Sequence, residues 1–130
     1  MATMSATALL ADAVLVLHGL FIAWVLVGGL AALRWPRLAW LHLPALAWAV
    51  WIAASGGICP LTPLEQDLRR AAGLAGWQGG FIEHYLTAAI YPDGLTRAAQ
   101  WWMAAGLLLG NVAVYGLWLQ RRRTRRRAVA

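Results

Sequence analysis

Long apolar runs dominate this chain, and short polar stretches separate them. Three of these runs, roughly residues 9–33, 38–58 and 101–119, contain few charged side chains. A helix needs about 20 apolar residues to cross a bilayer core about 30 Å thick. Each run therefore predicts a membrane-spanning helix, and Thr96 is placed to cap the third. We expect one all-α, helical integral membrane domain over residues 1–120.

A shorter helix is predicted over residues 63–72, after the second apolar run. Thr62, Pro63 and Glu65 fit an N-cap, a first helical position and the third position of a capping box. Glu65 is also spaced to pair with Arg69 one turn later. The apolar positions form one face, as in a helix that lies in the membrane interface. We expect this helix on the outer face of the bundle.

A second short helix is predicted over residues 81–91. Gly79 and Gly80 precede it, and the turn Pro92–Gly94 ends it. A helix of this length is only about 16 Å long, roughly half a bilayer. We therefore expect an amphipathic or re-entrant helix that completes an outer-face pair with the first short helix.

The composition agrees with a membrane protein. Hydrophobic residues make up 62 % of the chain and charged residues only 12 %. A soluble domain is nearer half apolar and a quarter charged. This composition excludes a small water-soluble fold. The first residues, MATMSAT, contain no basic side chain, so we do not expect a cleaved secretory signal.

The net charge of +6 is unevenly distributed. Six of the 11 Lys and Arg residues lie between Arg121 and Arg127, all of them arginines, and Arg34 and Arg37 lie between the first two apolar runs. With three spans these eight arginines share one side of the membrane. The positive-inside rule then places the basic tail, residues 121–130, in the cytoplasm and the N-terminus outside. We expect the tail to contact anionic lipid rather than nucleic acid.

Three sequence strings resemble the domain-of-unknown-function family 2784. They are RWPRLAWLHLPALAW at residues 34–48, CPLTPLE at 59–65 and GGFIEHYL at 79–86. The resemblance extends over roughly residues 9–119. It implies a small multi-span α-helical protein of the bacterial cytoplasmic (inner) membrane. It implies no assigned activity and supplies no catalytic residues.

Histidines within apolar segments are the first candidates for chemistry. His18 lies inside the first run, and it would be level with His84 if the second short helix dips into the outer leaflet. That pair could ligate haem, or a metal ion with Glu83 or Cys59 as a further ligand. His42 lies too far along the membrane normal to pair with His18. Alternatively, His18 makes one interhelical hydrogen bond.

Glu83, His84 and Cys59 are the candidate catalytic residues. Glu83 and His84 point about 100° apart on a helix, so both could face one cavity and exchange protons with a substrate. Alternatively, Glu83 complements the helix dipole at the first turn. Cys59 would need a lowered pKa to react, and the following helix N-terminus could supply it. Alternatively, Cys59 is a small apolar residue.

Small and polar residues in the third run favour close helix contacts. Gly106 and Gly110 form one G-x-x-x-G pair, which allows close packing within the fold, in a homo-oligomer or with a membrane protein partner. Asn111 is placed to add an interhelical hydrogen bond.

Three functional hypotheses follow from these features. The first is a non-enzymatic membrane subunit, scaffold or small-ligand-binding module. The second is a haem- or metal-binding redox protein that uses His18 and His84. The third is a carrier or enzyme for a lipid-soluble substrate that uses Glu83 and His84. The residues leave open whether the protein catalyses a reaction.

Overall fold

Four α-helices and one short 3-10 helix form the fold of the computed structural model, which describes residues 5–76, 84–85 and 96–130. They are α1 (Ala6–Arg34), η1 (Pro36–Leu38), α2 (Ala39–Ser55), α3 (Leu61–Ala71) and α5 (Arg97–Val129). No strand occurs within the described residues. Three segments, Ala6–Arg34, Pro36–Ser55 and Arg97–Val129, are long and apolar enough to cross a membrane. This confirms the predicted all-α class.

The second predicted short helix, 81–91, lies outside the described residues except for His84 and Tyr85. The same holds for Gly79, Gly80, Glu83 and the turn Pro92–Gly94, so those predictions stay untested.

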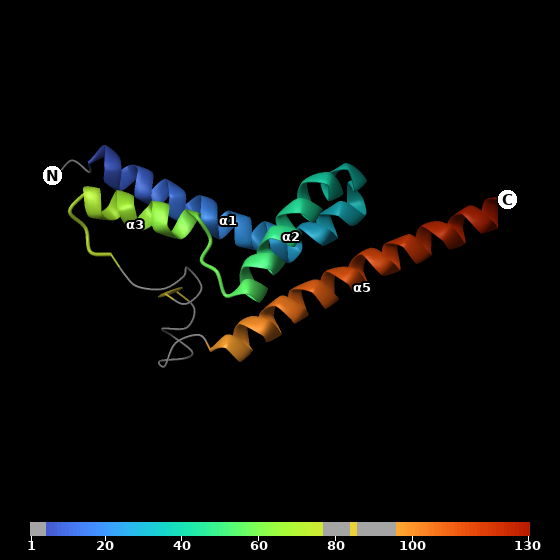
Figure 1. Ribbon diagram of the computed structural model, residues 1–130. Coiled ribbons are helices and arrows are strands. Elements are labelled where there is room, and N and C mark those ends of the chain that lie inside the picture. Colours follow the sequence, from blue (N-terminus) through green and yellow to red (C-terminus); the bar gives the residue numbers. More distant parts are fainter. Residues whose placement is uncertain (1–4, 77–83, 86–95) are drawn as a thin grey trace.

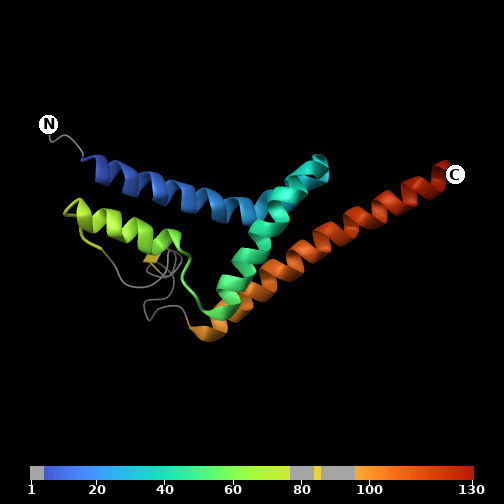
Figure 2. The ribbon, with the colours of Figure 1, turned by 45° about the horizontal axis from the view of Figure 1, so that its top comes forward.

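The helices form two packed groups that share α1 (Figures 1 and 2). α3 runs antiparallel to the first half of α1 and packs along it. η1 turns the chain at the end of α1, and α2 and α5 then pack against each other and against α1. α5 begins beside the end of α2 and runs in the opposite direction (Figure 2).

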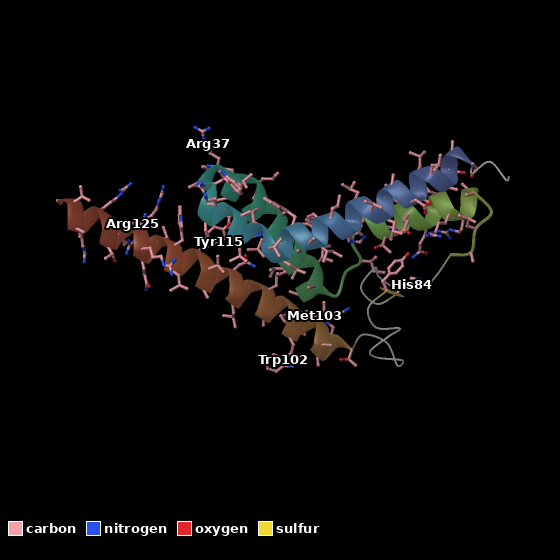
Figure 3. All side chains as sticks on the ribbon, turned by 180° about the vertical axis from the view of Figure 1, so that it is seen from behind. Arg37, His84, Trp102, Met103, Tyr115 and Arg125 are labelled. Carbon is pink, nitrogen blue, oxygen red and sulfur yellow. The ribbon has the colours of Figure 1, made fainter. Side chains whose placement is uncertain are left out.

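Burial in this molecule is reversed relative to a soluble protein. Large apolar side chains lie outside, such as Leu20, Trp40 and Leu109. Figure 3 shows Trp102 pointing away from the other helices. Among the described residues, the buried ones are mostly small or polar: Ala8, Ala11, Val25, Gly28, Gly29, Ala32, Leu46, Ala104, His18, His42, Thr62, Glu65 and Asn111. Lipid solvates apolar side chains well, so helices in a bilayer associate through small and polar residues.

Several helix ends follow local sequence rules. The Thr96 hydroxyl accepts a hydrogen bond of 3.2 Å from the Ala99 N–H, which confirms the predicted cap of α5. Gly73 follows the end of α3 and adopts a positive φ of 73°. The Gly73 and Leu74 N–H groups donate back to the Arg70 and Arg69 carbonyls. This is the Schellman arrangement that satisfies the last carbonyls of a helix.

The predicted capping box of α3 is wrong. The helix begins at Leu61 with Pro60 at the N-cap, so Thr62 and Glu65 are inside it. No described side chain caps this end. Thr62 and Glu65 are instead buried, and α3 packs along α1 rather than flat across the ends of the long helices. These two side chains therefore pack inside the fold and do not cap the helix.

The long helices also differ in length from the apolar runs. α2 ends at Ser55, where Gly56 adopts a φ of 71°. α5 continues to Val129, so the predicted basic tail is helical through its arginines. Arginine has a high helix propensity, which favours this continuation beyond the apolar run.

Candidate functional site

An apolar groove lies between α1, α2 and α5. Its volume is about 470 Å³. Phe21 and Leu26 line it from α1, Ala49 from α2, and Gly106 and Gly110 from α5. A Cβ added to either glycine would meet no atom within 4 Å. The G-x-x-x-G pair therefore opens the groove and is not used for helix packing among the described residues.

Asn111 is the polar residue that lines this groove. Its side chain is only 6 % exposed, and its Nδ2 donates to the Leu107 carbonyl at 2.9 Å. The predicted interhelical hydrogen bond is therefore wrong for the described residues, because the amide bonds within its own helix. Gly29 on α1 lies so close to the Asn111 Oδ1 that an added Cβ would be 2.7 Å from it. A glycine at position 29 thus lets α1 approach the amide.

A histidine joins the three long helices beside the groove, since its partner Val25 also lines the groove. His42 on α2 is fully buried, its Nε2 lies 3.2 Å from the Val25 carbonyl, and its Nδ1 lies 2.8 Å from the Tyr115 hydroxyl. A carbonyl only accepts, so Nε2 must carry the hydrogen. In the neutral ring Nδ1 then accepts from Tyr115, which Figure 3 shows beside α2. Gly28 makes room, because an added Cβ would lie 2.5 Å from the His42 ring.

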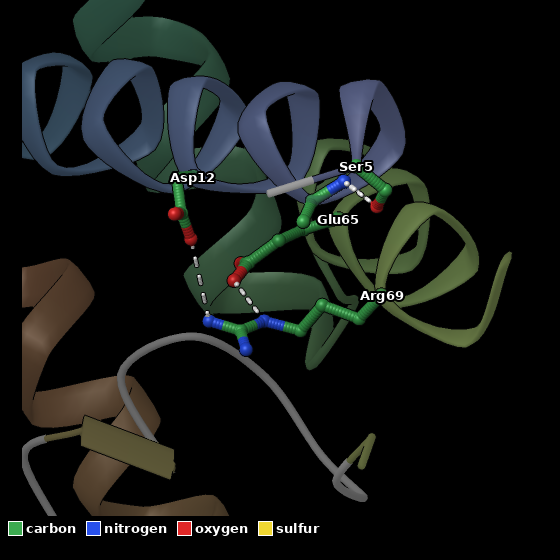
Figure 4. Close-up of polar contacts among 5 residues, drawn as sticks. Ser5, Asp12, Glu65 and Arg69 are labelled. Carbon is green, nitrogen blue, oxygen red and sulfur yellow. Dashed lines mark hydrogen bonds and ion pairs between the residues drawn. The ribbon is translucent and has the colours of Figure 1, made fainter. Parts of the chain in front are cut away.

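A second polar cluster connects α1 and α3. Arg69 Nε donates to Glu65 Oε1 at 3.1 Å, which confirms the predicted pair. The same guanidinium lies 4.0 Å from Asp12 Oδ1, so it sits between two carboxylates (Figure 4). The hydrogen bond from Arg69 to Glu65 raises the pKa of Arg69. Burial raises the pKa of the Tyr85 phenol, and the Glu65 charge beside it adds to this rise.

The predicted redox and catalytic residues are only partly placed. His18 is buried on α1, and the His84 ring packs edge-on against Tyr85 with centroids 4.7 Å apart. Cys59 has a free, half-buried thiol between α2 and α3. In the part of the chain that the structure describes, no group of three or more His, Cys, Asp or Glu could hold a metal ion. A haem or metal site at His18 and His84, and proton exchange by Glu83 and His84, stay predictions.

Arg97 closes the end of α2. Its guanidinium donates to the Ala53 carbonyl at 3.4 Å and to the Ala54 carbonyl. These acceptors belong to the last turn, whose carbonyls have no partner within the helix. Sequence reasoning missed this contact because the two positions are more than 40 residues apart.

Arginine–tryptophan pairs lie at the ends of the long helices. The guanidinium carbon lies 5.3 Å from the ring centroid in Arg97–Trp101 and 4.4 Å in Arg122–Trp118. Both pairs belong to α5 and bracket its apolar part. Tryptophan favours the membrane–water boundary, so these pairs mark where a bilayer surface would cross the helix.

The fold and these sites define an all-helical protein whose three long helices are compatible with a membrane. The family described as Protein of Unknown function (DUF2784) matches residues 8–116, so the chain belongs to this family. This confirms the resemblance seen in the sequence. No match was found among curated proteins or among solved structures.

Proposed function

We propose that this protein is a non-enzymatic, small-ligand-binding module of the bacterial inner membrane. The observation that supports it is the groove of about 470 Å³ between α1, α2 and α5. Small-ligand pockets commonly have volumes of about 300–1,000 Å³, with apolar walls and few polar groups. The ligand that fits such a groove is a lipid-soluble molecule that reaches it from the bilayer.

Asn111 lines the groove, so a matching ligand should carry a polar group that can pair with its amide. One N–H of the Asn111 Nδ2 donates to the Leu107 carbonyl, and Oδ1 lies against Gly29 of α1, which leaves the second N–H to donate to a ligand. The polar group that matches is a carbonyl or a hydroxyl. At a helical rise of about 1.5 Å, Asn111 lies about 15 Å along α5 from Trp101, near the bilayer centre. The ligand would therefore insert its polar end deeply and leave its apolar part in the groove.

The orientation of the protein follows from its arginines. Trp101 and Trp118 lie about 26 Å apart along α5, close to the thickness of a hydrocarbon core. The arginines of 121–127 are exposed and continue the helix beyond Trp118. We infer that this end of α5 lies in the cytoplasm and contacts anionic lipid.

The groove can be tested with a matched pair of glycine variants on α5. Gly110 lines the groove, Gly116 does not, and an added Cβ at either position meets no atom within 4 Å. Gly110→Leu therefore fills the groove, and Gly116→Leu adds the same side chain elsewhere. The probe is a pyrene-labelled fatty alcohol, and binding is measured by energy transfer from tryptophan in detergent micelles.

We expect Gly110→Leu to weaken probe binding by about tenfold, which corresponds to about 1.4 kcal/mol. Gly116→Leu should bind as the unchanged protein does. Equal binding by all three proteins would contradict the proposal. The oligomeric state of each variant is measured by light scattering, because the same glycines would also accept a helix of a second copy.

A further inference from the structure

Two buried oxygen atoms on α3 lack hydrogen-bond partners among the residues that the structure describes. Glu65 is fully buried and Thr62 is 1 % exposed, one turn apart on the face that packs against α1. Arg69 donates to Glu65 Oε1. Glu65 Oε2 and Thr62 Oγ1 have no hydrogen-bond partner among residues 5–76, 84–85 and 96–130. Buried polar oxygens are nearly always satisfied, so two neighbouring exceptions indicate a missing partner.

The charges around these oxygens favour a cation as that partner. Arg69 is shared between Glu65 and Asp12, so one guanidinium serves two carboxylates. Asp12 is half exposed, but Glu65 has no contact with water to compensate its charge. A buried carboxylate with incomplete compensation is unfavourable. The ionised Glu65 carboxylate can only accept, and the Thr62 hydroxyl oxygen also offers lone pairs, so both oxygens can bind a metal cation.

The composition of the cluster limits the kind of cation. The unpartnered atoms are a carboxylate oxygen and a hydroxyl oxygen, which are hard ligands. The described residues hold no set of three or more His, Cys, Asp or Glu suited to a metal ion. This disfavours a transition metal, and one carboxylate oxygen gives too little charge for a tightly held divalent ion. A monovalent, oxygen-binding cation fits best.

We propose that Glu65 Oε2 and Thr62 Oγ1 bind one Na⁺ ion between α3 and α1, with backbone carbonyls completing its coordination. Among the described residues, Asp12 on α1, Arg69 on α3 and the Tyr85 phenol are charged or titratable groups near Glu65. The ion would fasten α3 to α1. This site is separate from the groove and does not depend on the proposed ligand.

The test is thermal unfolding of the purified protein in a neutral detergent, followed by tryptophan fluorescence. NaCl is titrated against KCl and choline chloride at constant ionic strength. We expect Na⁺ to raise the unfolding temperature at concentrations where K⁺ and choline have little effect. Broadening of the ²³Na NMR signal by the protein measures binding directly.

Thr62→Val and Glu65→Gln remove the two ligands. We expect Thr62→Val to weaken the Na⁺ response at least tenfold and Glu65→Gln to abolish it. Asp67→Asn is the control, because Asp67 is an exposed acid of the same helix. Thr62→Ser keeps the hydroxyl and should keep the response, so a folding defect of Glu65→Gln does not prevent the test.

Two results would overturn the proposal. One is an equal response of the unchanged protein to all three chlorides, which would be an ionic-strength effect. The other is a response to acid and none to Na⁺, which would assign the balancing charge to a proton.

Discussion

At the scale of single residues, His42 connects all three long helices through hydrogen bonds. It lies on α2, donates to a backbone carbonyl of α1 and is hydrogen-bonded to Tyr115 of α5. A polar side chain without partners is costly within a membrane span. Both partners of His42 lie on other helices, so its hydrogen bonds favour the observed packing of α1, α2 and α5. The sequence showed a histidine in an apolar run, but nothing in it indicated these partners, because Tyr115 follows 73 residues later.

We expect His42→Phe and Tyr115→Phe each to lower the free energy of unfolding by about 1–3 kcal/mol, because each leaves a buried partner unsatisfied. The double variant should cost less than the sum of the two, by about 1 kcal/mol. Reversible unfolding in mixed micelles measures these values. Trp40→Phe, at a position 87 % exposed, is the control and should change little. Strict additivity would show that the two side chains do not interact.

At the scale of elements, α3 shows where sequence reasoning succeeded and where it failed. The helix itself was predictable because the Glu65–Arg69 spacing and Gly73 act within a few residues. The contact of α3 with α1 was not predictable, because Asp12 and Arg69 are far apart in the sequence and only the fold brings them together. The pattern around Thr62 predicted a capping box from neighbouring residues alone. In the structure Thr62 is instead buried within α3.

The three long helices were predictable from hydrophobicity alone, because a bilayer imposes length and apolarity on each of them separately. The groove was not, since it depends on how α1, α2 and α5 cross. Gly106 and Gly110 were noticed in the sequence as a packing motif, yet their side of α5 is open.

Arg69 is the residue whose loss should release α3. We expect Arg69→Met to destabilise the α1–α3 contact by about 3 kcal/mol, because Glu65 would remain buried with an uncompensated charge. Hydrogen exchange of the α3 amides should then become faster. Arg70→Met is the matched control, since the Arg70–Asp67 pair is exposed and should contribute less than about 1 kcal/mol. Unchanged exchange in Arg69→Met would contradict this account of the cluster.

At the scale of the whole molecule, the distribution of side chains favours a bilayer as the solvent. Apolar side chains cover the outside, and polar and small ones meet at helix contacts. The arginine–tryptophan pairs lie at both ends of the apolar part of α5. The groove opens between long helices, where lipid would surround it.

The orientation can be tested through Cys59, the single cysteine of the chain. We expect a membrane-impermeant maleimide to label Cys59 in intact spheroplasts, because the proposed topology places the start of α3 outside. In Cys59→Ala with Ala130→Cys, labelling should require lysis. Labelling of position 130 in intact spheroplasts would reverse the proposed orientation.

If the groove holds a lipid-soluble molecule, the purified protein should carry that molecule out of the membrane. The unchanged protein, Gly110→Leu and Gly116→Leu are purified in mild detergent, and bound molecules are measured by native mass spectrometry. We expect a carbonyl- or hydroxyl-bearing apolar molecule, near one per chain, on the unchanged protein and on Gly116→Leu, and its loss from Gly110→Leu. Equal retention by all three proteins, or no such molecule on any of them, would contradict it.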